Sequence, residues 1–75
     1  MTMTLAQIEY RYGSTWMIMD SAGGGWIAVR KHDLHPQLIA KGLSMARGGT
    51  TLDELARHLA TERRLEQQTK AEPTT

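Results

Sequence analysis

Residues 15–31 decide the fold of this chain, and they read TWMIMD (15–20), SAGGG (21–25) and WIAVRK (26–31). The first and last of these segments are short and rich in aromatic and aliphatic side chains, which is typical of β-strands. The glycines between them supply the positive φ angles that a tight turn requires. The stretch therefore predicts a β-hairpin.

Both faces of this hairpin are apolar. A strand that packs on one side only should alternate apolar and polar residues, whereas residues 16–19 and 26–29 are apolar without interruption. One register places Met17 and Met19 on the same face as Ile27 and Val29, and both tryptophans and Arg30 on the other face. The other register divides the side chains differently, into Trp16, Ile18, Ile27 and Val29 against Met17, Met19, Trp26 and Ala28. Because a slip of one residue exchanges the two faces, the sequence leaves both registers open.

The clearest helix signal lies in residues 50–66. Thr51 and Glu54 fit a capping box, in which the Thr51 hydroxyl accepts from the Glu54 amide and the Glu54 carboxylate accepts from the Thr51 amide. Apolar residues then recur at helical spacing, at Leu52, Leu55, Ala56 and Leu59. Arg63 interrupts this stripe, so we expect the helix to pack as far as about Thr61 and to fray beyond it.

Two other segments allow alternative structures. Residues 5–11 fit a short helix or a strand, and the alternation of Ile8, Tyr10 and Tyr12 with charged residues favours the strand. After the hairpin, Pro36 can open a short helix that Gly42 ends, followed by a strand over residues 43–47. A single helix over residues 36–47, closed by Gly48 and Gly49, is the alternative. We favour the short helix followed by a strand.

These elements predict an α+β domain over residues 5–66. We expect a small antiparallel sheet of about three strands packed on one C-terminal helix, with a short helix before the third strand. The tail, residues 67–75, has no large apolar side chain and is expected to be flexible. Residues 1–4 are also expected to be flexible.

The composition excludes several classes of protein. The chain has 75 residues and a mass of 8.4 kDa, is 40% hydrophobic and carries a net charge of +1. It has no apolar run long enough to span a bilayer, and its start lacks the pattern of a secretory signal, so we expect a cytoplasmic protein. Without cysteine it has no disulfide or thiolate chemistry. A domain of about 60 residues buries only about 60% of its unfolded surface, so association is expected to add stability.

The second apolar face of the hairpin requires a cover, because one helix covers only one face of a small sheet. An exposed patch of this kind is unusual on a monomer, and Met and Trp are enriched in interface cores. We therefore predict a homodimer through that face, or another protein partner, with an internal lid from residues 5–12 or 36–43 as the alternative. The candidate partner-binding residues are Trp16, Met17, Met19, Trp26, Ala28 and Arg30.

No catalytic constellation is visible, since the chain lacks a G-x-S-x-G elbow and a phosphate-binding glycine loop. His32, Asp33 and His35 contain zinc-binding residue types, but their spacing matches no standard motif. We therefore assign no catalytic, metal or cofactor residues and predict that the protein is not an enzyme.

The alternative function is that of a small DNA-binding regulatory protein. Basic residues outnumber acidic ones between residues 30 and 64, and a sheet or helix can place them on phosphates. Residues 51–59 resemble the first helix of a helix-turn-helix, but residues 60–65 provide no clean turn and too short a second helix. The candidate nucleic-acid contacts are Lys31, Arg47, Arg63 and Arg64.

Two motifs occur in a familiar order, GGWIA at 24–28 and GTTLDEL at 49–55. In this order the chain resembles the N-terminal domain of HicB-like antitoxins, and also small uncharacterised actinobacterial proteins with three strands followed by a helix. The Pro-Asp-Leu-Pro-Gly turn of the antitoxins is absent, and HDLHP stands at 32–36 instead. The resemblance implies a β-β-β-α fold, a toxin partner and a dimer.

Overall fold

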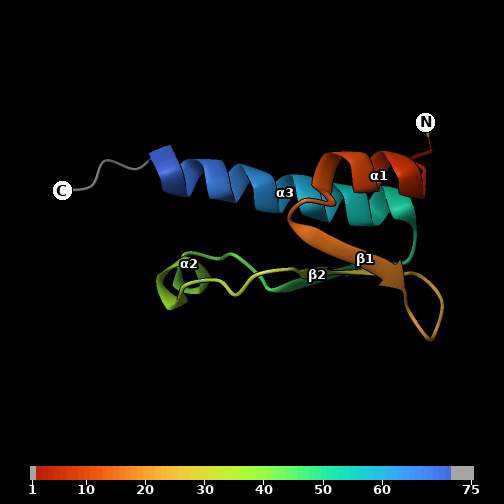
Figure 1. The fold of residues 1–75 in the computed structure, drawn as a ribbon, viewed down its shortest axis with the longest axis horizontal. Coiled ribbons are helices and arrows are strands. Elements are labelled where there is room, and N and C mark those ends of the chain that lie inside the picture. The colour runs from red at the N-terminus through yellow and green to blue at the C-terminus, as the bar shows by residue number, and fades with distance from the viewer. Residues whose placement is uncertain (1, 72–75) are drawn as a thin grey trace.

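A computed structural model describes residues 2–71, which form an α+β fold of two layers (Figure 1). The elements follow in the order α1 (Leu5–Tyr12), β1 (Trp16–Asp20), β2 (Trp26–Arg30), α2 (Pro36–Ala40), β3 (Ala46–Gly49) and α3 (Leu52–Ala71). The strands form one layer, and α1 and α3 lie together on one side of it. This confirms the predicted α+β fold class. Within residues 2–71, none of the helices has both the length and the apolarity needed to cross a bilayer.

The sheet is antiparallel, with the strand order β1-β2-β3. Met17 lies opposite Val29 and Met19 opposite Ile27, which is the first of the two registers that the sequence allows. The hairpin turn contains Gly24 and Gly25 at φ angles of 92° and 87°. These angles confirm the predicted glycine turn.

The core lies between the sheet and the two long helices. Each of α1, β1, β2 and α3 contributes buried side chains to it, namely Ile8, Tyr12, Trp16, Ala28, Leu55 and Leu59. Leu55 and Leu59 belong to the predicted apolar stripe of the C-terminal helix. Because α1 and α3 share this core, both helices cover the same face of the sheet.

The strand predicted for residues 5–11 is wrong, because this segment forms α1. Thr4 caps the helix: its hydroxyl accepts from the Gln7 N–H at 3.2 Å, and its own N–H donates to the Gln7 side chain at 2.9 Å. Ile8 and Tyr12 lie one helical turn apart and are buried, whereas Tyr10 is 92% exposed. The apparent period-two alternation therefore arises because Ile8 and Tyr12 share one buried face of the helix, while Tyr10 between them is exposed.

Met3 and Thr4 join the fold, although residues 1–4 are expected to be flexible; Met1 lies outside the described residues. Met3 packs against the core, and its backbone N–H donates to the carboxylate of Asp53 in α3. Together with the Thr4 cap, this contact fixes the start of α1 against the start of α3.

The interpretation favoured for residues 36–47 is confirmed in kind, with a short α2 followed by β3. Gly42, just after α2, has a φ of 103°, which permits the chain to reverse there. The strand begins at Ala46 and includes Gly48 and Gly49, so it lies later than the predicted residues 43–47. A Cβ on Gly49 would lie 2.7 Å from the Leu55 nitrogen, so this glycine allows the first turn of α3 to pack closely on β3.

The last helix is longer than predicted, since α3 continues to Ala71, and the expected fraying beyond Thr61 is wrong, because Glu62 is fully buried. Residues 67–71 are helical where the composition predicts a flexible tail, and residues 72–75 lie outside the described part. At the N-terminus the Thr51 hydroxyl accepts from the Glu54 N–H at 3.1 Å, as predicted. The Glu54 carboxylate instead accepts from the N–H and hydroxyl of Thr50, at 3.2 and 3.3 Å.

Candidate functional site

The sheet has an apolar face that points away from the helices. We call it the outer face; it consists of Met17, Met19, Ile27, Val29, Ala46 and Gly48. Met17 is 54% and Met19 39% exposed, and Ile27 and Val29 are half-buried. Within residues 2–71 no helix covers this face, because α1 and α3 both lie on the opposite side and α2 lies beyond one end of the strands (Figure 1). Neither of the two internal lids considered from the sequence therefore closes it.

The structure divides the six predicted partner-binding residues between the two faces of the sheet. Only Met17 and Met19 belong to the outer face. Trp16, Ala28 and Arg30 are buried on the helix side, and Trp26 is half-buried there against the core. The outer face adds two residues that sequence reasoning did not assign, Ile27 and Val29. The missing information was the hairpin register, which decides the face of every strand residue.

A cluster of charged side chains lies on the helix side of the sheet, and we call it the buried ion cluster: Arg30, Arg47, Glu62 and Glu66. Glu62 is fully buried. One of its carboxylate oxygens accepts from Arg30 at 3.0 Å and from the Ser44 N–H at 2.8 Å. The other accepts from Arg47 at 2.8 and 3.1 Å. The guanidinium of Arg30 also reaches Glu66 at 2.6 Å and lies 4.3 Å from the centre of the Trp16 ring.

The electrostatics of this cluster keep Glu62 ionised. Burial by itself raises the pKa of the Glu62 carboxyl, but hydrogen bonds from the Ser44 N–H, Arg47 and Arg30 lower it. The net pKa lies below the ordinary value for glutamate. Among the described residues, no buried side-chain nitrogen or oxygen lacks a hydrogen-bond partner. The cluster therefore joins α3 to β2 and β3.

Two of the four candidate nucleic-acid contacts are engaged within the chain. Arg47 is held by Glu62 in the buried ion cluster. Arg63 lies 4.5 Å from the centre of the Tyr12 ring and donates to the carbonyl of Arg11. Lys31 and Arg64 are exposed. Arg63 is itself exposed, so Arg47 is the one candidate that is held by a buried carboxylate.

Two of the histidines have structural contacts. The Nδ1 atom of His35 accepts from the Gln37 N–H at 3.2 Å and so caps α2. The Nδ1 atom of His58, in α3, lies 2.7 Å from the carbonyl oxygen of Gly48 in β3. Because a carbonyl can only accept, the His58 ring carries a proton on Nδ1 and donates it. In the described residues, no three histidine or carboxylate side chains gather to hold a metal ion.

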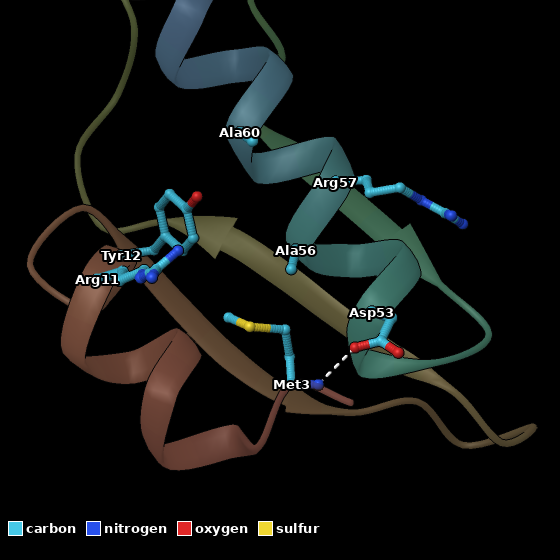
Figure 2. Close-up of a pocket in the computed structure, with 7 residues that line it drawn as sticks. All are labelled: Met3, Arg11, Tyr12, Asp53, Ala56, Arg57 and Ala60. Atoms are coloured by element: carbon cyan, nitrogen blue, oxygen red, sulfur yellow. Dashed lines mark hydrogen bonds between the residues drawn. The ribbon is translucent and has the colours of Figure 1, made fainter. Parts of the chain in front are cut away.

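An open hollow of about 390 Å³ lies between α1 and the first half of α3 (Figure 2). Its lining residues include Met3, Arg11, Tyr12, Asp53 and Arg57. Asp53 accepts from the Met3 backbone, and Arg57 points away from Tyr12 and Met3 (Figure 2). The charged groups do not converge on one point, so this hollow is not a built site for a ligand.

Comparison with protein-family models, with curated proteins and with solved structures finds no match to this chain.

Proposed function

We propose that this chain is a small, non-enzymatic binding module that acts through protein–protein contacts, and that a second copy covers its outer face. The observation that carries the proposal is the exposed apolar outer face, in a chain whose two long helices both pack on the other side of the sheet. Burying apolar surface contributes about 25 cal/mol per Å². A chain of 75 residues has a small core, so this contribution would be a substantial addition.

The chemistry of the outer face favours a second copy as its cover. In a two-fold symmetric dimer the same patch must fit itself. The outer face has no charged side chain among its strand residues, so stacking it on its copy opposes no like charges. Methionines adapt to irregular gaps, and Met17 and Met19 lie beside the aliphatic Val29 and Ile27 of β2.

The finer terms of this function rest on sequence alone. A regulatory role with a toxin partner follows from the resemblance to HicB-like antitoxins, and a cytoplasmic location follows from the lack of a secretory pattern; both stay predictions. Nucleic-acid binding is not proposed as a second function, because Arg47 is held by Glu62 and no observation favours it.

Sedimentation equilibrium tests the proposal through Val29→Lys, which places a charge on the outer face without touching the core. We expect the native protein to have at least twice the 8.4 kDa mass of the chain, and the variant to have half the mass of the native assembly. Ile39→Lys is the matched control, because Ile39 is 49% exposed on α2, away from the sheet. Circular dichroism should show that all three fold. A native mass of 8.4 kDa at every concentration would contradict the proposal.

A further inference from the structure

The two edges of the sheet are unlike each other. The strand order places β1 at one edge and β3 at the other. At the β3 edge, the carbonyl of Gly48 is hydrogen-bonded to the His58 ring of α3. At the β1 edge, no element within residues 2–71 pairs with the outward backbone groups of the strand. The β1 edge is therefore a free hydrogen-bonding surface.

The hydrogen bonds at the ends of the hairpin identify these groups. The Lys31 N–H donates to the Thr15 carbonyl at 2.9 Å, and the Ser21 N–H donates to the Gly25 carbonyl at 3.1 Å. In an antiparallel ladder, hydrogen-bonded and non-bonded pairs alternate. The intervening residues of β1 therefore direct their N–H and C=O groups away from β2, namely Trp16, Ile18 and Asp20.

The β1 edge also lacks several of the features that protect exposed edges. Proteins commonly guard an edge with lysine, proline, a bulge or a covering segment. Residues 16–19 are all apolar, and Asp20, at the end of the strand, carries its one charge. In Figure 1 the β1 arrow lies in front of β2, with the helices above it. A strand of this composition is typical of one that is paired in the assembled protein.

We propose that β1 pairs antiparallel with β1 of a second copy, across a two-fold axis at Ile18, to form one continuous sheet. This register is self-complementary: Ile18 lies opposite Ile18 of the second copy, and Trp16 lies opposite Asp20 of the second copy. All three residues direct their backbone groups outward, so every donor meets an acceptor. Met17 then lies beside Met19 of the second copy, and the two outer faces become one surface.

This edge contact goes beyond the proposed function, because it uses the backbone of β1 and the proposed function uses the side chains of the outer face. The two contacts are compatible. Edge pairing makes a wider sheet, and stacking of outer faces joins two such sheets. Each contact can therefore fail without the other, and the experiments separate them.

Amide hydrogen exchange, read residue by residue by NMR, tests the edge contact in the unmodified protein. We expect the Ile18 and Asp20 amides to exchange slowly, with protection that rises with protein concentration, because no described residue of the same chain accepts from them. Ala46 is the matched control at the opposite edge, and in the Val29→Lys background, where outer faces no longer stack over it, it should exchange rapidly at every concentration. If Ile18 and Asp20 exchange as fast as Ala46 in an assembled protein, the edge contact is overturned and the stacked outer face still stands.

Asp20→Pro provides a second test, because it removes an outward N–H that makes no bond within the chain. The preceding residue, Met19, is already extended, as a proline requires. Loss of the symmetry-related hydrogen bonds should raise the dissociation constant of the edge pair about tenfold or more, measured by sedimentation in the Val29→Lys background. Ala46→Pro, at the other edge, should leave this constant unchanged. Equal constants for Asp20→Pro and the parent would overturn the proposal, and if Asp20→Pro fails to fold, the exchange measurement decides.

Discussion

Glu62 shows how one residue connects the sequence to the tertiary structure. It lies two helical turns after Leu55, on the face of α3 that packs on the sheet, and it is fully buried. Arg30 from β2 and Arg47 from β3 both donate to it. Each guanidinium arrives from a different strand, so the carboxylate is satisfied only when α3 lies correctly across both. The buried ion cluster therefore specifies the position of the helix on the sheet.

Replacing Glu62 should strongly destabilise the fold. Glu62→Gln removes the charge that Arg47 pairs with and that Arg30 shares with Glu66, and breaking a buried pair in this way costs about 3–5 kcal/mol. This is comparable to the whole stability of a small domain, about 5 kcal/mol, so we expect a largely unfolded variant in urea titrations followed by circular dichroism. Glu66→Gln is the control, since the Glu66 side chain is 28% exposed, and it should cost about 1 kcal/mol or less. Similar losses in both variants would contradict this role for Glu62.

Glu62 should also make the fold sensitive to acid. Its pKa in the folded protein is lower than in the unfolded chain, so its stabilising contribution is fully present above the unfolded pKa of about 4.3. The contribution is lost as the pH falls through the lower folded pKa. We expect the contribution of Glu62 to the free energy of unfolding, measured in urea, to be constant from about pH 7 to about pH 4.3. It should then decrease as the pH is lowered further to about pH 3. A free energy that rises on acidification in this range would contradict the expectation.

At the scale of elements, the sequence predicts what depends on local signals. The hairpin and the C-terminal helix follow from glycines, apolar runs and the Thr51 cap, and the structure contains both. The strand prediction for residues 5–11 failed because Ile8 and Tyr12 satisfy a period of two as well as a helical turn. The overlooked signal was Thr4 followed by Gln7, which forms a capping box.

The candidate site was harder to predict, because it depends on contacts between distant segments. The two apolar faces of the hairpin were visible, but their division required the register. Glu62 was not identified as a buried residue, since its partners Arg30 and Arg47 come from strands whose faces the sequence leaves open. Their burial follows only when β2, β3 and α3 are placed together.

The contact between β3 and α3 gives a prediction at this scale. A Cβ at position 49 would meet the Leu55 backbone at 2.7 Å, and a helix backbone cannot yield as a flexible side chain can. Gly49→Ala should therefore destabilise the fold by about 1–3 kcal/mol, measured as a lower urea midpoint. Gly23→Ala is the control, because a Cβ there meets nothing within 4 Å. A midpoint equal to that of the control would show that the helix can shift without cost.

At the scale of the whole molecule, all of the covering helices lie on one side. The buried core is made by α1, α3 and the inner side of β1 and β2, whereas the outer face has no helix over it in the described part of the chain (Figure 1). A two-layer fold of this kind has one side that is complete within the chain. The other side is the exposed outer face, and it is the reason to expect a partner for a chain whose composition and net charge of +1 are ordinary.

The hydrogen bond between His58 and Gly48 bears on where self-assembly stops. A sheet with two open edges can add copies at both, and repeated addition of this kind builds a fibre. Here one edge has a carbonyl already occupied by a side chain of the same molecule. Pairing at β1 therefore uses up the fully open edge of each copy, so the sheet itself ends at two chains, and further growth is limited to stacking of the outer faces.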